Sequence, residues 1–183
     1  MIINERETRK EYMLEAAKQI MLAARTAPKG KGVDIIEIIT LSDEDIDAVS
    51  EELLRLAEKT GMKFLIRDSE NIQSADAMIV IGTRQAPQGL NCAYCGYATC
   101  AEKPQDTPCA INSIDVGIAI GSACAKAADL RVDSRVMFSA GWAGERLGPV
   151  EFSLLKNCRQ CIAIPISASS KNPFFDRKPK ENK

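Results

Sequence analysis

Four cysteines in the middle of the chain follow the spacing C-x2-C-x4-C-x8-C. They are Cys92, Cys95, Cys100 and Cys109. A compact group of thiolates suits an iron–sulfur cluster, because the chain must wrap a small inorganic cube and supply one sulfur to each corner iron. Glycines beside the cysteines, at positions 89 and 96, let backbone amides approach that cube. The residue types and their spacing therefore predict one [4Fe–4S] cluster.

Two other uses of these thiols have to be weighed. A structural zinc site more often pairs two C-x2-C units about 12 to 20 residues apart, which this segment does not do. Disulfides would close strained rings between cysteines so near in sequence. They also suit exported proteins, whereas the N-terminus of this chain, Met1 to Lys10, is charged and lacks the apolar core of a signal peptide. A structural metal such as zinc stays as the alternative to the cluster.

The identity of the fourth ligand is open at this point. Cys109 directly follows Pro108 and is the nearest candidate. Cys158 and Cys161 form a second C-x2-C at the edge of the last expected strand, where they offer a ligand, a redox dithiol or two ordinary core residues. The core interpretation is favoured, because free cysteine is among the most buried residue types. A thiol oxidoreductase that works through Cys158 and Cys161 is a third hypothesis, and Cys124 is expected to pack inside a helix.

Composition narrows the function further. The chain has no histidine among its 183 residues, which excludes Ser-His-Asp and Cys-His catalysis and every histidine-ligated metal site. A formal net charge of -1 argues against binding duplex nucleic acid, which needs a basic face. No stretch approaches about 20 continuous apolar residues, so no membrane span is expected. Seven cysteines without an export signal predict a cytoplasmic protein.

Helices and strands alternate around the cysteines, which predicts a mixed α/β or α+β fold in a single domain over residues 1–183. Apolar residues at helical spacing predict helices at residues 5–26, 42–61 and 112–128. Short apolar runs predict about five strands in a central sheet, at residues 33–41, 63–67, 77–82, 135–140 and 161–166. The cysteine-rich loop, residues 83–111, is too long for an idle connection and is expected to carry function.

The cysteine segment, Gly-Leu-Asn-Cys-Ala-Tyr-Cys-Gly-Tyr-Ala-Thr-Cys at residues 89–100, resembles the Cys-x2-Cys-Gly-x3-Cys signature of [4Fe–4S] domains in anaerobic electron-transfer and corrinoid proteins. The fourth cysteine, Cys109, comes closer here than in those domains. The whole chain is similar to an uncharacterised family of small prokaryotic proteins described as containing a ferredoxin domain. That likeness rests on residues 23–34, on the cysteine loop and on residues 171–177.

A second resemblance, to the nitroreductase family, rests on an Ala-Ala-Arg-x-Ala-Pro helix end at residues 23–28, a following strand and a later helix like residues 115–130. It implies a nitroreductase-like α+β sandwich, an obligate homodimer and FMN at the dimer interface. Lys29 and Lys31 replace the serine and asparagine that usually follow the Ala-Pro pair. With Arg177 in the basic tail, they are the candidates to hold the flavin phosphate. A solvated turn and a frayed terminus are the other interpretation of these charges.

The leading hypothesis is a redox protein that passes single electrons through one [4Fe–4S] cluster. With FMN bound it would be an oxidoreductase of the nitroreductase type, and without FMN an electron carrier; the residues do not decide whether it is an enzyme. The expected partner is a redox protein or a small-molecule electron acceptor, and not nucleic acid or a membrane. The alternative is a non-enzymatic dimeric binding module whose cysteines hold a structural metal. Gly117 and Gly121, on one face of the third helix, fit a homodimer interface and a buried core helix equally well.

Overall fold

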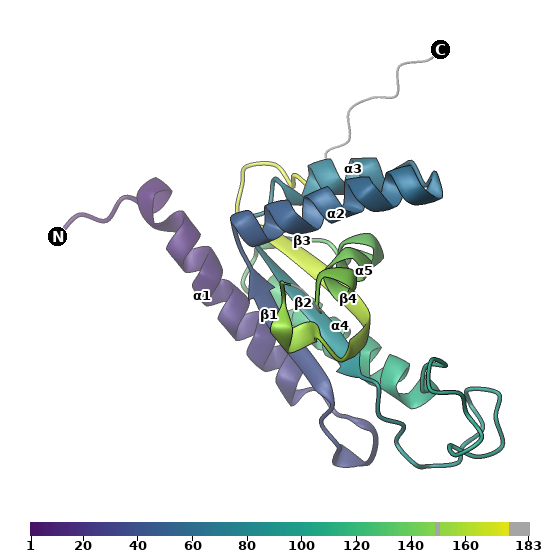
Figure 1. The fold of residues 1–183 in the computed structure, drawn as a ribbon. Coiled ribbons are helices and arrows are strands. Elements are labelled where there is room, and N and C mark those ends of the chain that lie inside the picture. Colours follow the sequence, from purple (N-terminus) through teal and green to yellow (C-terminus); the bar gives the residue numbers. More distant parts are fainter. Residues whose placement is uncertain (149–150, 176–183) are drawn as a thin grey trace.

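The computed structural model describes residues 1–148 and 151–175, in which helices cover both faces of a sheet (Figure 1). The helices are α1 (Glu5–Thr26), α2 (Glu44–Thr60), α3 (Phe64–Ile72), α4 (Ala110–Asp129) and α5 (Phe138–Leu147). The strands are β1 (Ile36–Leu41), β2 (Ala77–Arg84), β3 (Asp133–Ser134) and β4 (Cys158–Ser167). Among the described helices, none has the length and apolar character needed to cross a bilayer.

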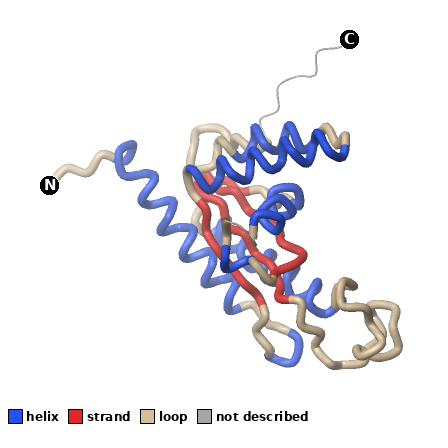
Figure 2. The backbone as a smooth tube through the Cα atoms, in the orientation of Figure 1, coloured by secondary structure: helices blue, strands red, loops and turns tan. Residues whose placement is uncertain are grey.

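The sheet has the order β1-β2-β4-β3 and its neighbouring strands all run antiparallel. Helices α1 and α4 pack on one face, and α2, α3 and α5 pack on the other. Figure 2 shows this arrangement, with the red strands between blue helices. The expected mixed α/β fold is confirmed, and it has four strands in the described residues instead of about five.

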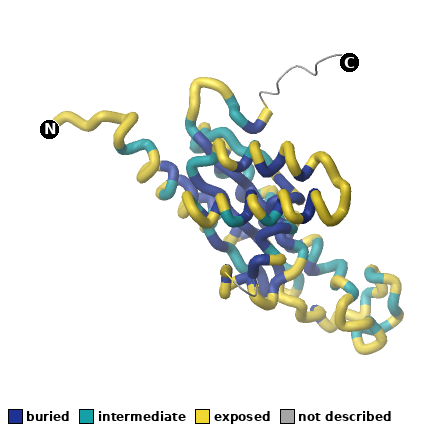
Figure 3. Tube along the Cα trace, turned by 45° about the horizontal axis from the view of Figure 1, so that its top comes forward, coloured by how far each residue is buried: buried dark blue, intermediate teal, exposed yellow. Residues whose placement is uncertain are grey.

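Strand β2 lies at the centre of the sheet and is buried on both sides. Successive side chains of a strand point to opposite faces, so residues two apart share a face. Ala77, Ile79 and Ile81 contribute to the core beneath α1 and α4, while Met78 and Val80 contribute to the core beneath α2, α3 and α5. Figure 3 shows this buried centre in dark blue. Strand β2 therefore lies between the two cores, and packing on both of its faces fixes the position of its two ends.

Strand β4 contains a bulge that changes which way its first residues face. Gln160 has a φ of 55°, and the pairing of β2 with β4 shifts register between Ile81 and Thr83. An extra residue of this kind reverses the alternation of the side chains that precede it. Cys158 and Cys161, three residues apart, therefore both contribute to the core beneath α2, α3 and α5.

Two predicted strands are wrong. The strand expected at residues 63–67 lies in helix α3, whose buried residues Leu65, Asp68, Ser69 and Ile72 recur at helical spacing. A short apolar run such as Phe-Leu-Ile does not distinguish a strand from a buried helix by itself. The strand expected at residues 135–140 is also wrong: only Met137 pairs there, as an isolated bridge to Ala163, and helix α5 begins at Phe138.

Helix α5 was not expected because it contains glycines, which disfavour helices. The packing explains the glycine at position 141. A Cβ atom there would lie 2.2 Å from the carbonyl oxygen of Cys161, so only glycine lets the helix approach β4 this closely. The remaining predicted elements are confirmed with end shifts of a few residues: α1 has the expected bounds, and α4 begins at Ala110 instead of residue 112, with Cys109 as its N-cap.

We predict that Gly141→Ala lowers the free energy of unfolding by about 3 kcal/mol, because the added methyl group collides with the backbone of β4. The matched control is Gly144→Ala in the same helix, where the Cβ atom would lie 3.8 Å from Val80 in ordinary contact. That change should leave stability unchanged or raise it by about 0.5 kcal/mol through better helix propensity. Urea unfolding followed by circular dichroism measures both, and equal effects of the two changes would contradict this account of α5.

Candidate metal centre

The cysteine-rich segment is the loop between β2 and α4, which extends from one end of the sheet (Figure 1, lower right). Its first residue follows Arg84 at the end of the central strand, and its last precedes Ala110 at the start of α4. Both anchors belong to elements that are buried in the fold, while most of the loop is exposed (Figure 3). The loop therefore combines fixed ends with an accessible middle.

The structure brings all four predicted ligands together. Cys92, Cys95, Cys100 and Cys109 line one narrow cavity of about 10 Å³. Each of these four thiols is half-buried, although most of their neighbours in the loop are exposed. The spacing of the cysteines thus turns four side chains toward a common space, including Cys109, which is nine residues from the preceding ligand candidate.

The backbone of the loop repeatedly takes the left-handed conformation that such a tight turn needs. Gly89, Asn91, Ala93 and Gly96 have φ angles of 69°, 48°, 60° and 90°. The Gly96 amide donates to the Ala93 carbonyl at 2.9 Å, which closes the turn between Cys92 and Cys95. Alternation of left- and right-handed residues points successive amides into one concavity, an arrangement found at phosphate and iron–sulfur sites. The Cβ atom of Ala93 crowds the backbone in this conformation, which costs conformational free energy that glycine would not lose.

Asn91 holds the third cysteine in place. Its side-chain Oδ1 accepts a hydrogen bond from the Cys100 amide at 2.8 Å. Asparagine also tolerates a positive φ better than most residues. Asn91 therefore both adopts the left-handed backbone of this turn and binds the Cys100 amide. The sequence analysis did not single out Asn91, although an asparagine directly before the first cysteine was a usable sign of a turn.

A helix N-terminus and a lysine lie beside the fourth cysteine. Cys109 is the N-cap residue of α4, where free backbone amides and the helix dipole favour negative charge. Lys103 lines the same cavity and donates from Nζ to the Pro104 carbonyl at 2.9 Å and to the Thr107 carbonyl at 2.5 Å. These bonds close the turn that leads to Cys109. Lys103 was also missed by the sequence analysis, because its position beside the thiols depends on the folded turn.

Four cysteine thiols are a donor set that suits both iron–sulfur clusters and zinc. No three or more His, Cys, Asp or Glu side chains within residues 1–148 and 151–175 converge to hold one metal ion. A single Zn²⁺ needs its four sulfurs at about 2.3 Å from one point, whereas a four-iron cluster takes each thiolate on a different iron. The cavity of about 10 Å³ is too small for the cube, so side chains of this exposed loop have to rotate outward to admit it.

The second cysteine pair lies elsewhere, in the core. Cys158 and Cys161 are 0% and 2% exposed. Burial raises the pKa of the Cys158 thiol to about 11, and the nearby Glu37 carboxylate adds to this shift. Burial also raises the pKa of Cys161 well above its usual range, again with a neighbouring carboxylate, Glu145. Both thiols therefore stay protonated at neutral pH, which disfavours a redox dithiol there.

The basic residues expected to hold a flavin phosphate are engaged with backbone carbonyls. Lys29 Nζ donates to the carbonyls of Ala24, at 3.3 Å, and Arg25, at the end of α1. Lys31 Nζ donates to the Gln88 carbonyl at 3.0 Å and so ties this turn to the cysteine-rich loop. Each ammonium group keeps at least one further N–H donor, so a phosphate site at Lys29 and Lys31 stays a prediction. Arg177, the third predicted residue, lies outside the described residues.

The turn that carries these lysines packs against α4. The Gly30 amide donates to both carboxylate oxygens of Asp115, at 2.9 and 3.1 Å. A Cβ atom at Gly30 would lie 2.6 Å from a methyl group of Ile111, so glycine is needed for this approach. Asp115 is 2% exposed and serves as an anchor that the sequence analysis missed. Gly30 and Asp115 are 85 residues apart in the sequence, so local sequence patterns cannot predict the contact between them.

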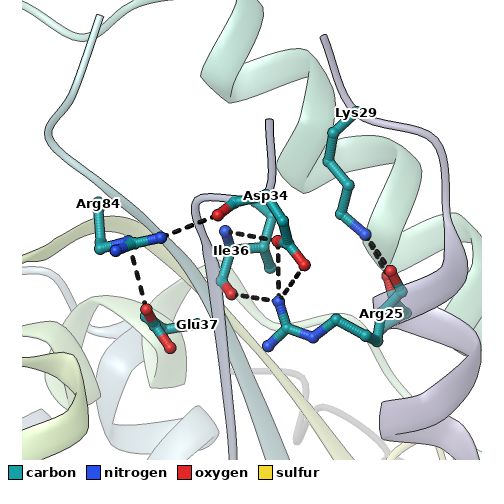
Figure 4. A network of polar contacts seen from close by, with 7 residues as sticks. Arg25, Lys29, Asp34, Ile36, Glu37 and Arg84 are labelled. Carbon is teal, nitrogen blue, oxygen red and sulfur yellow. Dashed lines mark hydrogen bonds and ion pairs between the residues drawn. The ribbon is translucent and has the colours of Figure 1, made fainter. Parts of the chain in front are cut away.

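A neighbouring polar network fixes the start of β1 (Figure 4). Arg25 donates to both Asp34 carboxylate oxygens, at 2.8 and 2.7 Å, and to the Ile36 carbonyl at 2.7 Å. Partial burial by itself raises the pKa of Asp34, but the hydrogen bonds from Arg25 and the Ile36 amide and the charges of Arg25 and Lys29 lower it below its usual value. Arg84 adds a bond to the Asp34 carbonyl at 2.8 Å. The Ala-Ala-Arg-x-Ala-Pro segment therefore supplies a structural clamp in this chain.

We predict that the two groups of cysteines differ in alkylation. In cluster-free protein at pH 8, iodoacetamide should modify the four half-buried loop cysteines first. Cys158 should stay protected until the protein unfolds, because a pKa of about 11 leaves only about one thiol in a thousand ionised. Mass spectrometry of tryptic peptides with and without urea measures this. Rapid native labelling of Cys158 or Cys161 would contradict their placement in the core.

Solved structures share this fold. Nitroreductase CinD from Lactococcus lactis, solved in complex with nicotinic acid, superposes with a TM-score of 0.62 at 15% identity, over 100% of this chain and 84% of that one. A nitroreductase with bound FMN from Desulfitobacterium hafniense gives 0.58 at 19% identity, over 92% and 86%. A BluB-like flavoprotein from Clostridium difficile gives 0.54 at 16% identity, over 92% and 84%. At these identities the likeness establishes the nitroreductase-like fold alone.

Sequence comparison identifies the family. An uncharacterized protein from Archaeoglobus fulgidus is 36% identical over 191 residues, which cover 99% of this chain and 100% of that protein. The profile of a family described as uncharacterized proteins containing a ferredoxin domain matches residues 105–177. The matched stretch includes Cys109 and extends past the end of β4. The chain therefore belongs to this family of ferredoxin-domain-containing proteins.

Proposed function

We propose that this protein is an electron carrier in which Cys92, Cys95, Cys100 and Cys109 hold one [4Fe–4S] cluster. The observation that carries the proposal is that these four half-buried thiols line one cavity in an otherwise exposed loop. The family description, which names a ferredoxin domain, supports the same chemistry. A cluster of this kind accepts and releases one electron at a time.

The residues around the cavity are suited to hold negative charge. Four thiolates and an iron–sulfur core carry a net negative charge, which the N-terminus of α4 beside Cys109 stabilises. Lys103 adds a full positive charge to the same wall. The left-handed backbone at Asn91 and Ala93 is of the kind that forms anion-binding concavities, and amides there would favour the reduced state of a bound cluster.

The position of the loop suits exchange of electrons with another molecule. It extends from the end of the sheet (Figure 2), and Tyr94, between the first two cysteines, is 72% exposed. Leu90, beside them, is 43% exposed. Exposed apolar side chains at a redox centre suit a transient contact with a partner protein or a small-molecule electron acceptor. The seven free thiols suit a reducing compartment such as the cytoplasm.

Cys109 is proposed as the fourth ligand on its position alone. It lines the same cavity as the other three, whereas Cys158 and Cys161 are enclosed in the core beneath α5. Moving either of them to the loop would require β4 to leave the sheet. The remaining thiol, Cys124, lies within α4 and packs beside the other core.

FMN is kept as a separate proposal, supported by the fold shared with a nitroreductase that was solved with FMN bound. The contacts of Lys29 and Lys31 do not decide it, because each ammonium group donates to backbone carbonyls and keeps at least one further N–H donor. We therefore route no step through a flavin. If flavin is bound, the protein as purified contains it, and acid release followed by fluorescence detects it; its absence would leave an electron carrier without a flavin.

A homodimer is the proposed assembly, and the outer face of α4 supports it. Over residues 110–127 of α4, the exposed residues are all apolar or small: Ile114, Gly117, Ile118, Gly121 and Ala125. The two glycines have nothing within 4 Å of a built Cβ atom, so a second helix has room to approach the backbone. An uncharged helix face of this kind suits burial against a second copy.

We predict that anaerobic reconstitution with iron and sulfide loads about four iron and four sulfide per chain. Cys109→Ala should lower the iron content to about three per chain or fewer, because one corner of the cube loses its ligand. Cys124→Ala, on the same helix, is the matched control and should load fully. Iron and sulfide assays, with an electron paramagnetic resonance spectrum after dithionite, measure this.

One result would overturn the cluster, and another would overturn its fourth ligand. Zinc in place of iron in the anaerobically purified protein would favour the structural-metal alternative. Loss of iron on Cys161→Ala with full loading of Cys109→Ala would move the fourth ligand to the second cysteine pair. The thermal stability of each apo-variant shows whether a failure to load is a failure to fold.

We also predict that Ile118→Glu converts the homodimer to a monomer, because it places a charge on the apolar face of α4. Leu54→Glu on α2 is the control, since Leu54 is 47% exposed and lies on a different surface. It should leave the assembly unchanged. Size-exclusion chromatography with light scattering gives the mass, and a wild-type protein that is monomeric at micromolar concentration would refute the assembly.

A further inference from the structure

A cleft of about 240 Å³ lies beside the candidate metal centre. Its walls come from four elements that are distant in sequence: the ends of β2 and the loop, the start of β4, the first turn of α4, and α5. Cys109 and Lys103 line both this cleft and the narrow cavity of the four cysteines. A molecule bound in the cleft would therefore share a wall with the proposed cluster.

The size of the cleft restricts what it can hold. Pockets for drug-sized ligands and cofactors span about 300 to 1,000 Å³. At about 240 Å³, this cleft has room for a small organic molecule, and an adjoining hollow of about 280 Å³ shares Arg84 and Arg159 with it.

The charges of the cleft favour an anion. Arg84, Lys103 and Arg159 line it, against Glu145 and Asp106, and the Nε of Arg84 also lies 3.3 Å from Glu37 behind the wall. The Arg159 guanidinium donates from Nη1 to the Cys158 carbonyl at 2.9 Å, and its Nε lies 3.7 Å from Glu145. A guanidinium carries five N–H donors in a fork that matches a carboxylate, so these two contacts leave donors for a ligand. The adjoining surface hollow adds Lys156 to the same side.

The neutral groups of the cleft favour a ligand that also donates a hydrogen bond. Asn112 lines the cleft, is 2% exposed and donates from Nδ2 to the Ala86 carbonyl at 2.9 Å. Its Oδ1 is buried and has no hydrogen-bond partner among the described residues. An unpaired buried acceptor costs free energy that a ligand hydroxyl would recover.

The backbone at the cleft is held in an unfavourable conformation. Gln160, in the bulge of β4, has a φ of 55° and lines the wall. Its side chain donates to Ser113 of α4 at 2.5 Å, which fixes the bulge against the helix. Backbone strain of this kind gathers at ligand sites, where the surrounding structure holds side chains ready for a partner.

We propose that this cleft binds a small organic carboxylate that also carries a hydroxyl group. Arg159 and Arg84 donate to the carboxylate, and the Asn112 side chain accepts from the hydroxyl. The site adds a ligand function to the proposed electron carrier, and its contacts come from residues other than the cysteines. Binding therefore does not require the cluster.

The test is calorimetric titration of L-malate into the protein, both cluster-free and loaded with iron and sulfide. Malate should bind to both forms, succinate more weakly because it lacks the hydroxyl, and the neutral succinamide not at all. Arg159→Gln should weaken malate binding about tenfold through the loss of charge-assisted hydrogen bonds. Glu145→Gln should strengthen binding several-fold, because a competing negative charge is removed from the wall.

The control is Arg146→Gln on α5, which pairs with Glu52 outside the cleft and should leave malate binding unchanged. Equal binding of succinamide, an unchanged affinity in a folded Arg159→Gln variant, or no binding of malate at millimolar concentration would overturn the site. Equal binding of malate and succinate would remove the role of the hydroxyl. Protein that binds malate but takes up no iron refutes only the cluster, and loaded protein that ignores malate refutes only the cleft.

Discussion

Burial of β2 on both faces of the sheet is the constraint on which the other elements depend. The five side chains from Ala77 to Ile81 are fully buried, and none of them is polar. Helices must therefore cover both faces, which α1 and α4 do on one side and α2, α3 and α5 on the other. Since α4 belongs to one of these layers, the chain that leaves β2 must reach the start of α4 from the end of the sheet. The cysteine-rich loop makes this connection.

The loop uses these fixed ends to gather ligands that its own sequence leaves flexible. Cys109 is held as the N-cap of α4, while Cys92, Cys95 and Cys100 lie on a turn closed by Asn91 and by left-handed backbone. A rigid anchor and an adaptable turn suit a site that must admit a cofactor and then hold it. The same end of the sheet also carries the cleft, so two kinds of chemistry have one structural origin.

Most of the positive charge near this end has a structural use. Lys29 caps α1, Lys31 ties the glycine turn to the cysteine-rich loop, and Arg25 clamps the start of β1 through Asp34. Chains that share the nitroreductase-like fold need not therefore place their charges for the same ligand. The chemistry of a site depends on which side chains remain available to a ligand when others make the contacts that hold the fold together.

The sequence by itself determined the features that depend on neighbouring residues. Spacing identified the four thiols and the loop, the absence of histidine limited the chemistry, and periodicity predicted α1 with its observed bounds and the mixed α/β class. Only the tertiary structure decided the matters that depend on contacts far apart in the chain. It placed Cys109 with the other three thiols and used a bulge at Gln160 to bury Cys158 and Cys161. It also made residues 64–67 and 138–140 helical where strands were expected. The physical reason is that local sequence patterns indicate only the propensity of a segment to form a helix or a strand. Packing against a backbone that is distant in sequence, as at Gly141, decides which conformation the segment adopts and which residues it contacts.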